Sequence, residues 1–209
     1  MVESKAKIDG EMYFTSNPNS DHHYQNFDFE LLGQTLHFIT DSGVFSKSTV
    51  DFGTRTMLEA LPNTKLIEGK VLDLGSGYGP VGIAVAKTFD REVDMTDVNE
   101  RALDLARKNA ERNGVSSLVN IFQSDVYANV QDKYALILAN PPIRAGKNVV
   151  TAMLQDAMHH LLPGGKLIAV LQKKQGAPSA QKNMASAFGN AKVIHKNKGY
   201  YILESTYGD

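Results

Sequence analysis

The feature that most constrains the fold is a regular alternation of strand and helix patterns that begins at residue 70. Apolar runs predict strands at residues 70–74, 92–96, 118–123, 134–139, 166–171, 192–195 and 200–206. Helical spacing and end signals predict helices between them, at 80–88, 99–112, 149–161 and 179–188. Strands that alternate with helices indicate one α/β domain with a doubly wound, mostly parallel sheet.

The residues before this alternation predict a short N-terminal extension. Residues 1–26 are polar and predict an irregular arm, and residues 27–40 alternate around Gly33-Gln34 as a β-hairpin does. From Thr49 the apolar spacing predicts a helix that Pro62 ends. We therefore expect an arm and hairpin over 1–40 and the α/β domain over 41–209.

Composition excludes several kinds of site. The chain has no cysteine, which excludes disulfides and thiolate metal sites and fits the reducing cytoplasm. No apolar run reaches the length of a membrane span, and the six histidines have no metal-ligand spacing. We expect a cytoplasmic protein without membrane or metal partners, either a monomer or a homodimer.

The net charge of −1 hides a strong asymmetry along the chain. Residues 1–139 carry 13 Lys and Arg against 20 Asp and Glu, a balance of −7, whereas residues 140–209 carry 9 against 3, a balance of +6. A basic segment of this kind either faces a polyanion or forms a solvated surface. The sequence leaves both interpretations open.

Two adjacent prolines end the fourth predicted strand, in the segment YALILANPPIRAGK at 134–147. Because proline cannot donate to a sheet ladder, Asn140-Pro141-Pro142 must end the strand. A turn needs only one proline, so the second suggests that something at this position has to be rigid. The alternative is a simple strand terminator.

A glycine-rich loop, in VLDLGSGYGP at 71–80, follows the first predicted strand. Its spacing is neither the G-x-G-x-x-G of dinucleotide binders nor that of a phosphate-binding P-loop. Asp73 stands two residues before the first glycine, where its carboxylate would repel a pyrophosphate. It suits a ligand that presents an amine.

Two more acids end the second and third predicted strands. Asp97, followed by Val98, is placed to accept the hydroxyls of a ribose, and Asp125, followed by Val126, is placed for the amine of a base. Ligands of open α/β sheets bind at these carboxyl ends. An amine-bearing tail, a ribose and a base amine together describe S-adenosylmethionine.

The segments DLGSGYG, TDVN, SDV and NPPI, in this order, resemble class I S-adenosylmethionine-dependent methyltransferases over residues 40–206. GVFS at 43–46 and DFGTR at 51–55 resemble the small-domain branch related to the small-subunit ribosomal RNA guanine-N2 methyltransferases. The resemblance implies a Rossmann-like seven-stranded sheet of order 3-2-1-4-5-7-6 with the last strand antiparallel. Residues 41–209 would then be a class I methyltransferase domain.

The resemblance also implies a role for each site residue. The Asn140 side chain and the carbonyl of Pro141 would accept the two hydrogens of a target amine. Substrate contacts are expected at Pro142, Ile143, Arg144 and Lys147. Cofactor contacts are expected at Phe45, Asp73, Gly75, Ser76, Gly77, Gly79, Asp97, Val98, Asp125, Val126 and Asn140.

Ile143 stands where many base-modifying relatives carry an aromatic that stacks on a flipped base. Tyr78, Phe45 or the Tyr13-Phe14 pair are candidates for the missing ring. The leading hypothesis is methylation of an exocyclic guanine amine in ribosomal RNA. The alternatives are methylation of an adenine amine or of a protein glutamine, and a non-catalytic RNA-binding module; a nicotinamide oxidoreductase is disfavoured by the loop spacing.

Overall fold

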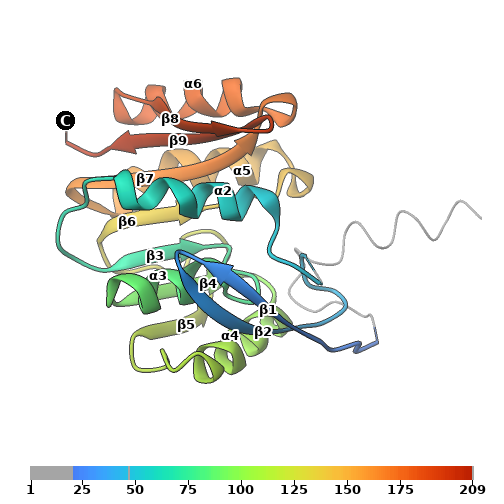
Figure 1. Ribbon diagram of the computed structural model, residues 1–209. Helices are drawn as coiled ribbons and strands as arrows, with labels where there is room; N and C mark the ends of the chain where they lie inside the picture. Colours follow the sequence, from blue (N-terminus) through green and yellow to red (C-terminus); the bar gives the residue numbers. More distant parts are fainter. Residues whose placement is uncertain (1–20, 47, 209) are drawn as a thin grey trace, which may run out of the picture.

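The central element of the computed structural model, which describes residues 21–46 and 48–208, is a seven-stranded sheet (Figure 1). Its strands are β3 (Val71–Leu74), β4 (Val93–Asp97), β5 (Val119–Gln123), β6 (Tyr134–Ala139), β7 (Leu161–Gln172), β8 (Lys192–Asn197) and β9 (Tyr200–Thr206). They lie in the order β5-β4-β3-β6-β7-β9-β8, and β9 is antiparallel to both of its neighbours. This confirms the expected order 3-2-1-4-5-7-6 with an antiparallel last strand.

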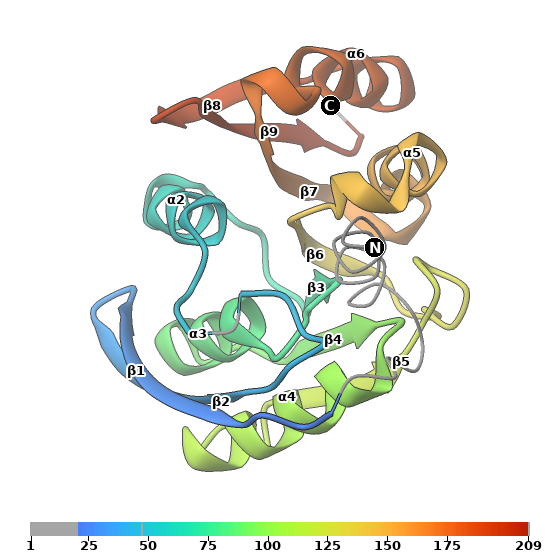
Figure 2. The ribbon, with the colours of Figure 1, turned by 90° about the vertical axis from the view of Figure 1, so that its right-hand side faces the viewer.

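In the described part of the chain, five α-helices cover the two faces of the sheet. They are α2 (Phe52–Ala60), α3 (Pro80–Phe89), α4 (Glu100–Arg112), α5 (Lys147–Gln155) and α6 (Ala177–Phe188). Figure 2 shows α2, α3 and α4 on one side of the sheet and α5 and α6 on the other. Successive strand residues face opposite cores, as Val71 and Leu72 do, because side chains alternate along a strand. Within the described residues, no helix is long and apolar enough to cross a membrane.

The predicted hairpin is present as a separate two-stranded sheet, β1 (Gln25–Leu31) and β2 (Gln34–Thr40), with its turn at Leu32-Gly33. Its β2 edge is held by side-chain amides of α4 and of its C-cap residue, Asn113. Asn109 Oδ1 accepts from Ile39 N at 2.7 Å, and Asn113 Oδ1 accepts from His37 N at 3.0 Å. These amides satisfy backbone groups that a neighbouring strand would otherwise satisfy.

The helix predicted at 149–161 and the strand predicted to start at 166 are misplaced. Helix α5 ends at Gln155, a 3₁₀ segment follows, and β7 begins at Leu161 and runs through Pro163-Gly164-Gly165. The strand continues through these residues because Tyr207 pairs with it. Gly164 N donates to Tyr207 O, and Tyr207 N donates to Gly165 O. Such long-range pairing has no local sequence signal.

Candidate active site

A cavity of about 960 Å³ opens at the carboxyl ends of the central strands. Nearly all predicted site residues line it, namely Phe45, Asp73, Gly75, Ser76, Gly77, Asp97, Val98, Asp125, Val126, Asn140, Pro141, Pro142, Ile143 and Arg144. Gly79 and Lys147 do not. Gly79 is the N-cap of α3, where a Cβ would lie 2.7 Å from Met95 Cε, and Lys147 is the first, exposed residue of α5.

The glycine loop folds as a backbone cradle at the edge of the cavity. Gly75 N and Ser76 N both donate to Thr96 O at 2.8 Å, and Gly77 N donates to Asp97 Oδ2 at 2.8 Å. Gly77 has φ +57°, and a Cβ there would meet no atom within 4 Å. The loop therefore leaves room for a ligand to approach the backbone closely.

Asp73 is buried beneath this loop, with 3% of its surface exposed. Its Oδ2 accepts from Gly82 N at 2.8 Å. Burial raises the pKa of this carboxyl to about 7; the Gly82 hydrogen bond opposes the rise, and the nearby charge of Asp97 adds to it. A buried acid of this kind gains stabilisation from a cationic group placed beside it, which fits the amine of S-adenosylmethionine.

Asp97 lies at the end of β4 and organises both the loop and the start of the next helix. Its Oδ2 accepts from Gly77 N, and its Oδ1 accepts from Asn99 N at 2.9 Å. Burial raises its pKa, and the hydrogen bonds from Asn99, Gly77 and Val98 oppose that rise. Each carboxylate oxygen carries a second lone pair, so both can still accept from a hydroxyl.

Two further groups suit a ligand that carries an adenosyl moiety. Asp125 is exposed at the cavity after β5, and Val126 beside it has a left-handed φ of 49°. Ser76 Oγ is buried at the cavity and has no hydrogen-bond partner among the described residues. The donors and acceptors of the cavity thus fit S-adenosylmethionine.

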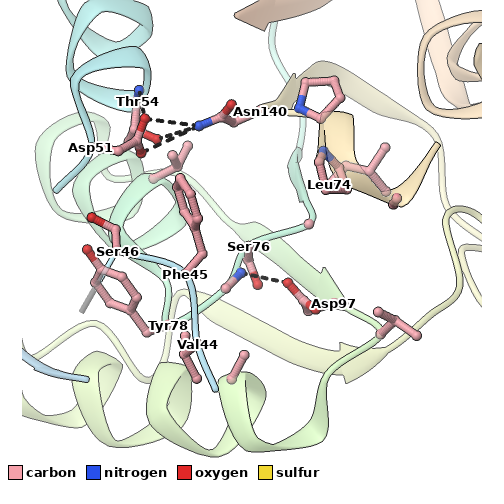
Figure 3. Close-up of a pocket in the computed structure, with 18 of the residues that line it drawn as sticks. Val44, Phe45, Ser46, Asp51, Thr54, Leu74, Ser76, Tyr78, Asp97 and Asn140 are labelled. Carbon is pink, nitrogen blue, oxygen red and sulfur yellow. Dashed lines mark hydrogen bonds between the residues drawn. The ribbon is translucent and has the colours of Figure 1, made fainter. Parts of the chain in front are cut away.

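Asn140 follows β6 on the opposite wall of the cavity. Its Nδ2 donates to Thr54 Oγ1 at 3.1 Å and lies 3.3 and 3.4 Å from the two carboxylate oxygens of Asp51 (Figure 3). With the nitrogen held by α2, the side-chain oxygen is the polar atom left for a ligand. Asn140 is therefore presented as a hydrogen-bond acceptor.

Two large apolar side chains at the cavity are exposed: Phe45 and Ile143, with 46% and 36% of their surfaces accessible. Tyr78 lines the cavity, but its ring is 2% exposed and packs edge-on against Phe27 and Phe38. Burial, and then the charge of Asp51, raise the pKa of its phenol. Tyr78 is thus a core residue; the Tyr13-Phe14 pair lies outside the described residues.

The sequence interpretation missed the contribution of α2 and β9 to this wall. Asp51 and Thr54 line the cavity, and Tyr200 joins them from β9. The helix predicted from Thr49 begins at Phe52, because Asp51 is its N-cap and accepts from Thr54 N at 3.1 Å. An Asp followed by helical spacing is an N-cap signal that would have found this start.

The family model of the methyltransferase small domain matches residues 35–204. The chain is 45% identical to the uncharacterised protein YbxB of Bacillus subtilis, over 93% of this chain and 98% of that protein. It is 32% identical to ribosomal RNA small subunit methyltransferase C of Vibrio parahaemolyticus, over 88% of this chain and 53% of that protein.

Among solved structures, the T. thermophilus 16S rRNA N2 G1207 methyltransferase, in complex with AdoMet and guanosine, matches 91% of this chain and 52% of that chain. The TM-score is 0.79 at 25% identity. The chain thus spans about half the length of these rRNA methyltransferases and nearly the whole of YbxB. It belongs to the methyltransferase small domain family and is an S-adenosylmethionine-dependent methyltransferase.

Proposed function

We propose that the protein methylates the exocyclic N2 amine of a guanine in small-subunit ribosomal RNA. The observation that carries the proposal is the fixed amide of Asn140, whose oxygen is available to an amine at the cavity. The names of the matched rRNA methyltransferases and the G1207 N2 target of the matched structure support the choice of guanine.

The three acids would hold the cofactor along one wall. Asp73 would accept from the ammonium group, Asp97 from the ribose hydroxyls and Asp125 from the adenine amine. S-adenosylmethionine supplies an electrophilic methyl group on a sulfonium sulfur. The order of the acids along β3, β4 and β5 matches the order of these groups along an extended cofactor.

Asn140 and Pro141 would position the nucleophile. The Asn140 oxygen and the Pro141 carbonyl would accept the two amine hydrogens, which favours a more tetrahedral nitrogen whose lone pair is directed at the methyl carbon. The nitrogen forms its new bond as the carbon–sulfur bond breaks, and one amine proton then leaves to solvent. No strong base is required, since the methylated nitrogen is acidic until that proton leaves.

Phe45 and Ile143 would confine the flipped base. They are two of the three large apolar side chains that are exposed among the described residues, and both lie at the cavity. Apolar and aromatic faces suit a planar base, because packing against them offsets the cost of unstacking the base from its neighbours in the RNA. Phe45 would supply the aromatic ring that Ile143 does not provide.

The rim of the cavity suits RNA. Arg144 lies on the rim two residues after Pro142, and Lys147 follows on α5. Lys173 N donates to Gly199 O at 2.8 Å, so the end of β7 lies beside the β8–β9 turn and gathers Lys173, Lys174 and Lys198 on this side. These exposed cations would neutralise phosphates around the target nucleotide. An rRNA substrate would also place the protein in the cytoplasm.

The test is methyl transfer from radiolabelled S-adenosylmethionine to small ribosomal subunits and to free rRNA, both from a strain that lacks the protein. After digestion, chromatography with mass spectrometry should find the label in N2-methylguanosine. Label in an adenosine derivative or in protein glutamine would overturn the guanine assignment. Transfer to free RNA but not to subunits, or the reverse, would identify the physiological form of the substrate.

A further inference from the structure

The nitrogen of the Asn140 amide points into a polar niche at the start of α2. The niche consists of the Thr54 hydroxyl, 3.1 Å from Nδ2, and the Asp51 carboxylate, 3.3 and 3.4 Å from it (Figure 3). Thr54 is 3% exposed, so this contact is shielded from water. Asn140 and its two partners are more than 80 residues apart in the chain.

The chemistry of the niche determines which way the amide faces. A side-chain amide can be rotated by 180° at little steric cost, which exchanges its donor and acceptor ends. An ionised carboxylate only accepts hydrogen bonds, so Asp51 attracts the NH₂ end and repels the oxygen. In the alternative orientation, Asn140 would present a donor to an amine that is itself a donor, and the catalytic contact could not form.

The niche is itself rigidly held. Asp51 caps α2, since its Oδ1 accepts from Thr54 N at 3.1 Å and its carbonyl accepts from Arg55 N at 3.1 Å. At Gly53 a Cβ would lie 2.9 Å from the ring of Tyr200, so the absence of a side chain lets α2 pack closely on β9. The carboxylate and the hydroxyl are therefore fixed relative to the sheet that carries Asn140.

We propose that Asp51 and Thr54 are positioning residues for methyl transfer, which act through Asn140 and do not touch the substrate amine themselves; this rests on the proposed function. They hold the Asn140 oxygen towards the target nitrogen. The negative charge behind the amide also polarises it, which makes the oxygen a stronger acceptor as positive charge develops on that nitrogen. No proton moves to Asp51.

The segment 51–54 and the Asn-Pro-Pro segment would then share one task. Asp51 would have two separable roles, as a helix cap and as an orienting charge. A cap alone would make Asp51 important only for stability, and it would leave the Thr54 hydroxyl without an effect on rate.

The test is a double-mutant cycle in single-turnover methyl transfer at saturating S-adenosylmethionine. Thr54→Val removes the hydroxyl at nearly constant volume and should slow transfer by about 2- to 12-fold, the range for a neutral hydrogen bond. Asp51→Ser keeps a helix cap but cannot reach Asn140, and it should slow transfer by about 10- to 150-fold, the range for a charged partner. In an Asn140→Ala background, neither substitution should slow transfer further.

Thr56→Val is the matched control. Thr56 lies on the same helix, is fully buried, and donates its hydroxyl to Phe52 O at 2.8 Å without lining the cavity. It should lower the melting temperature at an unchanged transfer rate. The proposal would be overturned if Thr56→Val slowed transfer as much as Thr54→Val does. It would also be overturned if Thr54→Val or Asp51→Ser slowed transfer further in the Asn140→Ala background.

A second readout needs no substrate. The side-chain NH₂ signals of Asn140 in ¹H–¹⁵N spectra should shift and exchange faster with water in Thr54→Val and Asp51→Ser, but not in Thr56→Val. Unchanged signals in both variants would overturn the positioning role whatever the substrate is. If the label instead appears in adenosine or glutamine while the signals shift as expected, the guanine assignment fails and the positioning role stands, because those amines need the same acceptor.

Discussion

The cavity lies between two regions of opposite character. On one side, which we term the cofactor side, Asp73, Asp97 and Asp125 lie at the ends of β3, β4 and β5, within a segment of balance −7. On the other, the substrate side, Asn140 and the following cations belong to a segment of balance +6. In the sheet, the two sides meet between the adjacent strands β3 and β6. Ligands of open α/β sheets bind at such a place.

The two sides also differ in how deeply their charges are placed. Asp73 and Asp97 are held by backbone N–H groups, and burial raises the pKa of both. Arg144 and Lys147 are exposed. Substitutions of Asp73 or Asp97 should therefore change local structure and ligand affinity together, whereas cation substitutions on the substrate side should change only encounters with a polyanion.

The largest effect should come from Asn140, which lies where the two sides meet. Asn140→Ala should lower the methyl-transfer rate by about 10²–10³, by analogy with the loss of one preorganised oxyanion-hole donor. Cofactor affinity and folding should persist. Single-turnover transfer, set beside a thermal melt, checks this; early melting with a normal rate would mean that Asn-Pro-Pro only ends a strand.

On the cofactor side, Asp97→Ala should weaken S-adenosylmethionine binding by about 1.5–3 kcal/mol, the range for hydrogen bonds to a charged group. The loss should include loosening of the glycine loop, since Gly77 N loses its acceptor. Isothermal calorimetry measures the affinity, with Asp104→Ala on the exposed face of α4 as the control. Equal affinities in the two variants would remove Asp97 from the cofactor site.

Cofactor binding should also depend on pH through Asp73. Because its pKa is about 7 in the free protein, the carboxyl is largely protonated at pH 6 and must lose that proton to receive an ammonium group. Affinity should fall roughly five- to tenfold from pH 7.5 to 6, and it should also fall above about pH 8 as the cofactor amine deprotonates. Calorimetry of Asp73→Asn should show no decline on the acid side; a decline of equal size would assign it to another group.

The same pKa has the opposite consequence for the stability of the free protein. A carboxyl whose folded pKa exceeds its unfolded value binds its proton more tightly when folded. The contribution of Asp73 to stability should therefore fall as pH rises from about 4, the ordinary pKa of an aspartate, to about 7, its pKa in the fold. Asp73→Asn should remove this decline in denaturant titrations of the free protein.

The smallest effect is expected on the substrate side. Arg144→Ala with Lys147→Ala should flatten the salt dependence of RNA binding by roughly one unit of slope per lost phosphate contact, at unchanged cofactor affinity. Arg144 lines the cavity and Lys147 does not, so the single Arg144 variant should account for more of the change. The control is Lys65→Ala with Lys87→Ala. If both double variants give the same slope, Arg144 and Lys147 belong to a solvated surface and not to an RNA contact.

Much of this architecture could be predicted from the sequence, but for unequal reasons. The apolar runs located six of the seven strands of the sheet to within a residue or two, and the acids at their ends lie where the parallel arrangement requires. The strand order rested on the family resemblance, because periodicity does not encode which strands pair. The division into 1–40 and 41–209 stays a prediction.

What escaped prediction depends on partners far apart in the chain. The start of β7 was missed because Tyr207 sustains the strand through Pro163-Gly164-Gly165. The contact of Asp51 with Asn140 was missed because the two residues are 89 positions apart. Neither contact has a local sequence signal, whereas the glycine loop and the strand ends can be recognised from a few adjacent residues.

Asn109 gives the hairpin an influence on the cofactor side. Its fully buried amide donates to Ile39 O in β2 at 3.0 Å and to Tyr78 O in the glycine loop at 2.9 Å. A ligand that immobilises the loop also restrains this asparagine and, through it, the β2 edge. By thermodynamic reciprocity, peeling the hairpin from α4 must weaken ligand binding by the same factor by which the ligand strengthens the hairpin's attachment. The hairpin is thus linked to the cofactor loop through one buried side chain, that of Asn109.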